Sequence, residues 1–203
     1  MRKNKVAFLM LIMIGALLVV SYPTISKKFS HAKDFQNSLE LSEGDYIVGK
    51  DFPTGTYDFV VTDDRVEILG WELFKNQQVV GMSLSNDNVL SISGSGKVRM
   101  EKADFAKIPQ EENQYVFSDV GWYQIGKQIP AGSYQVKYLT SMKAFEEAPY
   151  VQTSKKNDSI ITSSIELTSE YQRIDLVSGE TLYLDFQKSN NEEFQVVFEK
   201  GKD

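Results

Sequence analysis

The stretch Gly44-Asp-Tyr-Ile-Val-Gly-Lys-Asp-Phe-Pro-Thr-Gly-Thr-Tyr-Asp-Phe59 occurs a second time, 77 residues later, as Gly121-Trp-Tyr-Gln-Ile-Gly-Lys-Gln-Ile-Pro-Ala-Gly-Ser-Tyr-Gln-Val136. Seven of the 16 positions are identical, and most of the others exchange residues of similar character. The identical positions are an initial glycine, a Gly-Lys pair, a proline, a further glycine and two tyrosines. This internal repeat predicts two related modules in one chain.

Each copy has the pattern of two short strands joined by a turn. Tyr46 and Val48 stand in alternation, as expected for a strand with one apolar face. Pro53 and Gly55 suit a type I turn, because proline favours its second position and glycine its fourth. Tyr57 begins a second alternating run. We therefore expect a β-hairpin or β-arch in each copy, built from residues that serve folding first.

The two lysines of the motif, Lys50 and Lys127, are an exception, because a turn does not require a cation. We interpret them first as solvated loop residues and second as candidate contacts for a partner or ligand.

The pattern Tyr-x-Val/Ile-Gly-Lys-x-φ-Pro-x-Gly-Ser/Thr-Tyr, in which φ is apolar, resembles a repeat of extracytoplasmic Gram-positive proteins. Proteins with that repeat are often membrane-anchored or lipid-anchored, and most have no assigned activity. The resemblance covers the two 16-residue segments and brings no catalytic residue with it. This chain departs from the lipid-anchored members because it has no cysteine to acylate.

The N-terminus has the pattern of a membrane-inserting segment. Basic residues within Arg2–Lys5 precede an uncharged run, Val6–Ser26, of 21 residues. As a helix this run would be about 31 Å long, close to the thickness of a bilayer core. The basic residues predict a cytoplasmic N-terminus, with the rest of the chain outside. We favour an uncleaved signal anchor. The alternative is secretion after cleavage of a signal peptide with Val6–Val20 as its apolar region.

The chain beyond the anchor is predicted to be β-rich. Short strand patterns separated by Gly, Asn, Asp and Ser turns follow residue 43, and no long amphipathic helical period occurs there. We predict an all-β fold of two tandem small β-sandwich or barrel-like modules after a single N-terminal transmembrane helix. The predicted segments are a cytoplasmic tip and signal anchor (1–26), a stalk (27–43), β module 1 (44–109), a linker (110–114) and β module 2 (115–203).

The later strands of the two modules can be aligned at an offset of 84 residues, with the extra residues of module 2 in a loop around Ser154–Asp158. The pairs at this offset are Leu90 and Ile174, Ile92 and Leu176, Val98 and Leu182, and Met100 and Leu184. A module of about 75 residues buries a modest core by itself. We therefore expect the two modules to pack together or to exchange edge strands.

The composition leaves little room for familiar catalytic or metal chemistry. The chain has no cysteine, which excludes disulfides, thiolate metal sites and cysteine nucleophiles. Its one histidine, His31, falls in the predicted stalk, so we expect no Ser-His-Asp triad. Adjacent carboxylates such as Asp63-Asp64 and Glu146-Glu147 would point to opposite faces of a strand, unlike the facing pair of a glycosidase. We expect no cofactor, no metal and no enzymatic activity. A carboxylate-dependent hydrolase is the least favoured alternative.

The charge balance is acidic, with 22 basic and 28 acidic residues. Without the three basic residues of the N-terminal tip, 19 basic residues remain and the exterior part has a net charge of −9. This charge argues against nucleic acid as a partner. It also argues against bulk electrostatic attachment to anionic lipids or wall polymers.

Aromatic residues make up 12% of the chain and include Trp71 and Trp122. Such residues are often in the core, but they also form sugar-stacking or protein-binding surfaces. Trp122 is the stronger candidate, because Asp45 occupies the matching position of the first copy and an aspartate indicates solvent exposure. The candidate contacts for a partner or ligand are Trp122, Trp71, Lys50 and Lys127.

Together these patterns predict a non-catalytic, membrane-anchored extracytoplasmic protein that binds or scaffolds at the cell envelope, with a protein or glycan partner. The alternative is an accessory subunit of a larger envelope or secretion complex. Exposed aromatics in a groove would favour a glycan, and an exposed edge strand or apolar patch would favour a protein. Two facing carboxylates in a cleft would favour the hydrolase.

Overall fold

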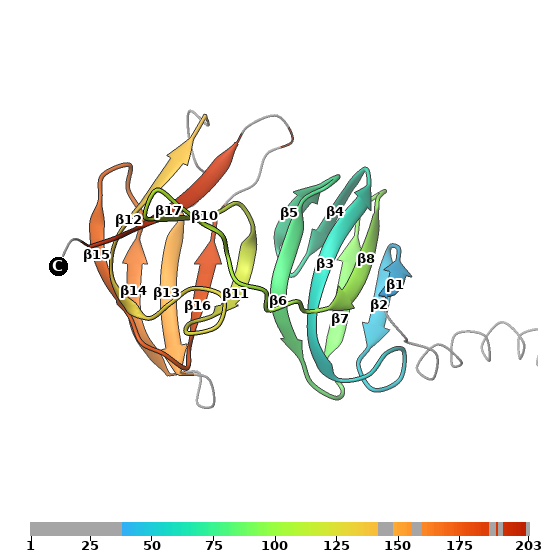
Figure 1. Ribbon diagram of the computed structural model, residues 1–203. Helices are drawn as coiled ribbons and strands as arrows, with labels where there is room; N and C mark the ends of the chain where they lie inside the picture. Colours follow the sequence, from blue (N-terminus) through green and yellow to red (C-terminus); the bar gives the residue numbers. More distant parts are fainter. Residues whose placement is uncertain (1–37, 142–147, 156–159, 187–189, 191–192, 202–203) are drawn as a thin grey trace, which may run out of the picture.

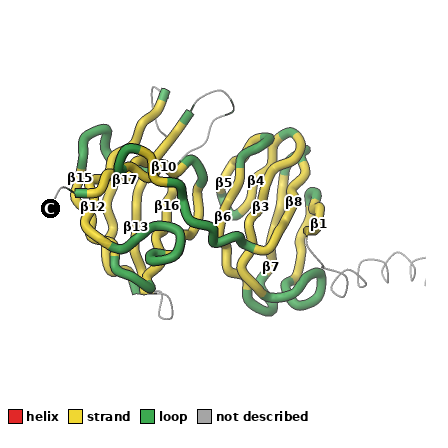
Figure 2. Tube along the Cα trace, viewed as in Figure 1, coloured by secondary structure: helices red, strands yellow, loops and turns green. Residues whose placement is uncertain are grey.

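The described part of the chain is built of β-strands. The computed structural model describes residues 38–141, 148–155, 160–186, 190 and 193–201 (Figure 1). Within these residues there are strands, bridges and turns but no helix (Figure 2), so the all-β prediction is confirmed. The predicted signal anchor lies outside the described residues. In the ranges given above, no helix is long and apolar enough to span a bilayer.

The strands are short and most of them alternate buried and exposed side chains, as in β3, where Tyr57, Phe59 and Val61 are buried. The strands are β1 (Ser38–Leu41), β2 (Gly44–Ile47), β3 (Gly55–Asp63), β4 (Arg65–Ile68), β5 (Trp71–Phe74), β6 (Gln78–Leu84), β7 (Val89–Ser93), β8 (Lys97–Lys102), β9 (Gln110–Glu111), β10 (Gln114–Phe117), β11 (Val120–Gln124), β12 (Gly132–Thr140), β13 (Tyr150–Lys155), β14 (Ile161–Glu166), β15 (Gln172–Leu176), β16 (Glu180–Asp185) and β17 (Phe194–Lys200).

The strands form two modules that lie side by side in Figure 1. In the first module the strand orders are β1-β8-β3-β6 and β2-β7-β4-β5. In the second they are β10-β17-β12-β15 and β11-β16-β13-β14, with β9 added beside β10. Each strand of the first module therefore has a counterpart in the second. Buried aliphatic and aromatic side chains form one connected core through both.

The repeated motif folds in the same way in both modules. The Gly49 N–H donates to the Phe52 carbonyl, and the Gly126 N–H donates to the Ile129 carbonyl, each at 2.7 Å. Both glycines have a positive φ, 89° and 92°, which a residue with a side chain adopts at a cost. The glycine of the Gly-Lys pair is therefore explained by the positive φ that the backbone adopts at this position.

The second tyrosine of each copy fastens the turn. The hydroxyl of Tyr57 donates to the Pro53 carbonyl at 2.7 Å, and that of Tyr134 donates to the Pro130 carbonyl at 2.9 Å. Both tyrosines are 1% exposed. Each ring therefore fills the core while its hydroxyl satisfies a turn carbonyl. The proline and tyrosine of the motif act as one structural unit.

The offset of 84 residues predicted for the later strands is wrong. Leu90 faces Tyr46 in the β2–β7 pair, and Leu182 faces the equivalent Tyr123 in the β11–β16 pair. The counterpart of Leu90 is therefore Leu182, 92 residues later, whereas Ile174 faces Tyr134 in β12. The offset grows because the segment between β12 and β15 is longer than the segment between β3 and β6. Apolar spacing alone does not locate such an insertion.

Short strands occupy part of the predicted stalk and of the predicted linker. β1, at the end of the predicted stalk, pairs with β8 and places Leu41 in the core. It corresponds to β10, which pairs in the same way with β17. β9, within the predicted linker, pairs with β10. The first module therefore includes a strand before the repeated motif, as the second does.

The two modules share one sheet. β6 pairs in parallel with β11, with Val79 opposite Val120 and Val80 opposite Gly121. The sheet β1-β8-β3-β6-β11-β16-β13-β14 is therefore continuous from one module to the other, and Figure 1 shows β6 and β11 facing each other between them. The modules pack together by joining edge strands and do not exchange them.

Two glycines allow this approach of the strands. A Cβ on Gly121 would collide with the Val80 carbonyl oxygen, and a Cβ on Gly81 would collide with the Trp122 carbonyl oxygen. Any side chain at either position would therefore force the modules apart. Gly81 has a φ of 67° and belongs to a bulge of β6 opposite Asp58.

Asp58 holds the bulge in place. One of its carboxylate oxygens accepts the Gly81 N–H at 2.7 Å, and the other accepts the Asp104 N–H at 3.0 Å. Burial raises the pKa of Asp58, and the two main-chain hydrogen bonds oppose that rise. The carboxylate therefore serves the junction, since both of its oxygens are already bound to the backbone.

Replacing Gly121 by alanine should open the junction. The new methyl group would collide with the Val80 carbonyl, and Gly121 also has a positive φ of 127°. We expect the free energy of unfolding to fall by about 2–3 kcal/mol. Thermal unfolding followed by circular dichroism measures the loss.

Gly44→Ala is the matched control for that variant. Gly44 holds the equivalent place in β2 with a φ of 153°, and a Cβ there would lie 3.7 Å from the Tyr46 ring, an ordinary contact. This variant should lose about 1 kcal/mol, from backbone strain alone. Equal losses in the two variants would show that the close approach of β6 and β11 contributes no stability.

Tyr134→Phe should alter the alkaline stability of the protein. Burial raises the pKa of Tyr134 from 10 to about 12. The unfolded chain therefore releases this proton first. The contribution of the raised pKa to stability is complete below pH 10 and is lost as the pH rises toward 12.

At pH 7 the Tyr134→Phe variant should be less stable by about 1 kcal/mol, because the Pro130 carbonyl loses its hydrogen-bond donor. Between about pH 10 and pH 12 its stability should approach that of the wild type, since phenylalanine has no proton to lose. Urea unfolding at a series of pH values measures both effects. A difference that stays constant up to pH 12 would contradict the raised pKa.

Candidate binding groove at the module junction

A groove of about 830 Å³ lies where the two modules meet. Sites for small ligands usually have volumes of about 300–1,000 Å³. The first module contributes residues of β6 and the β4–β5 turn, the connecting segment contributes Phe105, and the second contributes residues of β11, β13 and β16. The groove therefore depends on the junction of β6 and β11.

Aromatic, neutral polar and cationic side chains line the groove together. The aromatic residues are Phe105 and Trp122, and the cationic residues are Lys127 and Lys155. Serine, threonine, asparagine and glutamine residues from both modules add hydroxyl and amide groups. The lining contains no carboxylate among the residues that the structure describes. Such a surface can stack on an apolar ring face and bond to hydroxyl groups.

Trp122 stands on β11 with its ring stacked on Tyr183 at a centroid distance of 4.9 Å. It is partly buried and lines the groove. Asp45, at the equivalent place in β2, is exposed and accepts a hydrogen bond from the Ser91 hydroxyl at 2.7 Å. Position 45 therefore faces solvent, as its aspartate indicated, whereas the first module partly covers Trp122.

Trp71 supports Trp122 from the first module. Its indole N–H donates to Oδ1 of Asp185 at 2.9 Å, and its ring lies 5.6 Å from the Trp122 ring, edge to face. The Tyr183 hydroxyl donates to Oδ2 of Asp185 at 2.9 Å. Burial raises the pKa of Tyr183, and the charge of Asp185 adds to the rise. Trp71 thus forms a hydrogen bond between the modules and fixes the aromatic cluster.

Lys127 extends from the motif loop of the second module. Its Nζ lies 5.6 Å from the centroid of the Phe105 ring, a distance at which a cation is attracted to an aromatic face. The Ile108 N–H donates to the Gln128 carbonyl at 2.9 Å and fixes the motif loop to the connecting segment. The groove wall therefore presents an aromatic ring and a cation next to each other.

Lys50 has the same place in the first copy of the motif, but it is exposed and does not line the groove. The structure thus brings Trp122 and Lys127 together in one groove, sets Trp71 against Trp122 and leaves Lys50 outside. The two lysines differ because the motif loop of the second module, and not that of the first, contributes to the groove.

The groove residues that were not singled out from the sequence include Phe105, Lys155 and Leu69. These three come from the connecting segment, the end of β13 and the β4–β5 turn, which meet only after β6 has joined β11. One signal was available, because Gly81 interrupts the apolar run of β6. A glycine inside a strand pattern indicates a bulge or a close backbone approach.

Leu69 has an unusual backbone conformation at the rim of the groove. It forms the two-residue β4–β5 turn with Gly70, and both have a positive φ, 49° and 89°. Asparagine or glycine usually takes the first of these positions, since a leucine there costs about 1 kcal/mol. The Leu69 side chain is nevertheless 56% exposed. The hairpin turn accounts for the positive φ, and the leucine adds an exposed apolar side chain to the rim of the groove.

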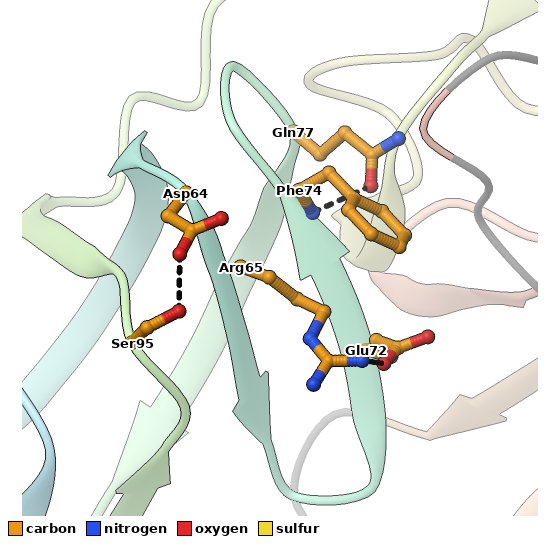
Figure 3. A network of polar contacts seen from close by, with 6 residues as sticks. All are labelled: Asp64, Arg65, Glu72, Phe74, Gln77 and Ser95. Carbon is orange, nitrogen blue, oxygen red and sulfur yellow. Dashed lines mark hydrogen bonds and ion pairs between the residues drawn. The ribbon is translucent and has the colours of Figure 1, made fainter.

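A separate polar network lies on the β4–β5 hairpin and its neighbours (Figure 3). It consists of an Arg65–Glu72 ion pair at 2.6 Å, a hydrogen bond from the Ser95 hydroxyl to Asp64, and one from the Phe74 N–H to Gln77 Oε1 at 3.0 Å. Both partners of the ion pair are more than half exposed, so the pair contributes at most about 1 kcal/mol. This network stabilises turns at the surface and includes one carboxylate of the Asp63-Asp64 doublet.

Metal ligands do not gather in the described ranges, where no three or more histidine or carboxylate side chains come together. No protein-family model matches the chain, and no curated protein is found to be similar to it. The function is therefore argued from the geometry of the groove.

Proposed function

We propose that this chain is a non-catalytic binding protein of the cell envelope. Its N-terminal apolar run would anchor it in the membrane as a single span, with two tandem β-sandwich modules on the outer face. The junction groove would hold its ligand, which we propose to be an envelope saccharide. The observation that carries the proposal is the meeting of aromatic, hydroxyl and amide side chains in one groove of suitable volume.

The side chains of the groove suit a sugar. The C–H face of a sugar ring packs on an aromatic ring, which Trp122 and Phe105 supply. Its hydroxyl groups need donors and acceptors, which neutral polar residues such as Thr56, Gln124 and Thr181 supply. These residues come from both modules, so a bound saccharide would contact both.

The groove is also built in advance of any ligand. Trp122 is held by stacking on Tyr183 and by the edge of Trp71, which is itself bonded to Asp185. Side chains that are already ordered lose little entropy on binding. A groove fixed in this way favours a binding function.

The carboxylates near the groove support a non-catalytic role. Hydrolysis of a glycoside by two carboxylates needs both to face the substrate. Asp58, which belongs to the junction, has both oxygens bound to main-chain N–H groups. The described residues of the lining include no carboxylate. We therefore favour a binding protein over a carboxylate-dependent hydrolase as the proposed function.

Trp122→Ala should weaken saccharide binding by about tenfold or more, since an aromatic ring near the centre of a site often contributes over 1.4 kcal/mol. Isothermal titration of the full-length chain in lipid nanodiscs with solubilised cell-wall saccharides measures the affinity. Tyr171→Ala is the matched control, because Tyr171 is an aromatic residue that is 42% exposed and outside the groove. Equal affinity in the wild type and the Trp122 variant would contradict the proposed site.

A second candidate is the accessory subunit of a larger envelope complex, and the edge strand β14 favours it. β14 pairs with β13 and ends the eight-stranded sheet. Ile161 is 56% exposed, and the preceding Ile160 is 53% exposed. No charged residue occurs from Ile160 to Ile165, although charges commonly protect such edges. An extended segment of another protein could add a strand there.

Ile161→Lys should remove a protein partner that adds to β14, because a charge at an edge opposes strand addition. Affinity capture of the full-length protein from gently solubilised membranes, followed by mass spectrometry, compares the variant with the wild type. Val177→Lys is the matched control, since Val177 is 55% exposed and lies between β15 and β16. A stoichiometric partner that the Ile161 variant also retains would contradict the role of β14.

A further inference from the structure

We infer that the saccharide bound in the groove is anionic and that Lys127 and Lys155 contact its acidic groups. This inference rests on the proposed function and narrows the ligand from saccharides in general to those with carboxylate or phosphate substituents. It is carried by the charge of the lining, by the contacts of the two lysines and by the position of Lys127 beside Phe105.

The charge of the groove is opposite to that of the chain. The whole sequence has 28 acidic residues against 22 basic ones. Among described residues, the lining has two lysines and no acidic side chain. A concave site of one sign inside a surface of the other sign concentrates the field at that site. An anionic ligand would therefore meet repulsion over most of the surface and attraction in the groove.

The two lysines are available to a ligand. Both are exposed, and neither forms an ion pair with a carboxylate of the described residues. Glu180 lies opposite Lys155 in the pairing of β13 with β16, but its carboxylate accepts a hydrogen bond from the Thr162 hydroxyl at 3.0 Å. No ion pair joins Lys155 to Glu180 or to any other described carboxylate, so its ammonium donors are open to a ligand.

Lys127 and Phe105 together form a seat for an acidic sugar. The Phe105 ring can receive the apolar face of a sugar, while the Lys127 ammonium group, 5.6 Å from the ring centroid, can reach an acidic substituent. Lysine acts as a point charge with three donors, which suits a phosphate or a carboxylate without fixing one orientation. The turn of the motif does not require a lysine, and this inference gives Lys127 a role as the contact for the acidic group.

This specificity accords with the net charge of −9 in the exterior part of the chain. Such a surface does not attach to an anionic polymer by bulk attraction, because long-range repulsion opposes it. Binding must then come from short-range contacts in the groove. Repulsion by the acidic surface would restrict the binding of an anionic polymer to the groove.

The test compares three polymers with one backbone: neutral dextran, carboxymethyl dextran and phosphorylated dextran. The full-length chain in nanodiscs of zwitterionic lipid is titrated with each, and the fluorescence of its two tryptophans, Trp71 and Trp122, reports binding. We expect at least one charged polymer to bind about tenfold more tightly than dextran. Its identity distinguishes carboxylate from phosphate recognition.

The double variant Lys127→Ala, Lys155→Ala should bind the charged polymer about tenfold more weakly and dextran unchanged. Lys50→Ala is the control, since Lys50 has the same place in the motif but lies outside the groove. Equal binding of all three polymers by the wild type would overturn the anionic ligand and leave the saccharide groove standing. A charged polymer that binds the double variant as tightly would overturn the role of the lysines. No binding of any polymer would overturn both the inference and the proposed saccharide function.

Discussion

The close approach of β6 and β11 is the constraint on which the rest of the structure depends. Gly81 and Gly121 leave no room for a Cβ between the strands, so the two modules meet backbone to backbone. Asp58 accepts a hydrogen bond from the Gly81 N–H and so fixes the bulge of β6 next to β11. The Trp71 indole N–H donates a hydrogen bond across the junction to Asp185. Because main-chain pairing is directional, this contact sets the modules in one orientation. The groove is a consequence of that orientation.

The junction also shows how the two copies of the repeat have diverged. β15 is the counterpart of β6, and β2 is the counterpart of β11, yet both lie at the edge of a sheet. Arg173 stands in β15 where β6 has Gly81, and Asp45 stands in β2 where β11 has Trp122. Charged residues at an edge oppose further strand pairing, and the glycine and tryptophan favour it. The inner edges are thus suited to joining and the outer edges to remaining apart.

Local signals in the sequence predicted the all-β class of the fold and the short strands of each motif, whereas the relation between modules was not predictable from them. Gly49, Pro53 and Tyr57 act within a few residues of one another, so their pattern defines the turn that they build. The alignment of later strands failed because an insertion before β15 changes the offset without changing the apolar alternation. Phe105 and Lys155 carried no signal, since their place in the groove depends on a contact between modules. Gly81 did carry a signal, because a glycine inside a strand pattern indicates a bulge or a close backbone approach, but the sequence does not show which strand approaches it.

The same loop therefore has different surroundings in the two modules. In the first module Lys50 extends into solvent, and in the second Lys127 lies beside Phe105 in the groove. The motif forms the same turn in both modules. In the second module the chain also places other residues, such as Phe105, next to the lysine. The binding site that we propose at the junction would belong to neither copy of the repeat alone, and the pattern of the repeat would then predict the fold without indicating a ligand. The pairing of β6 with β11 connects the fold to the groove, because it makes the motif loop of the second module one wall of the groove.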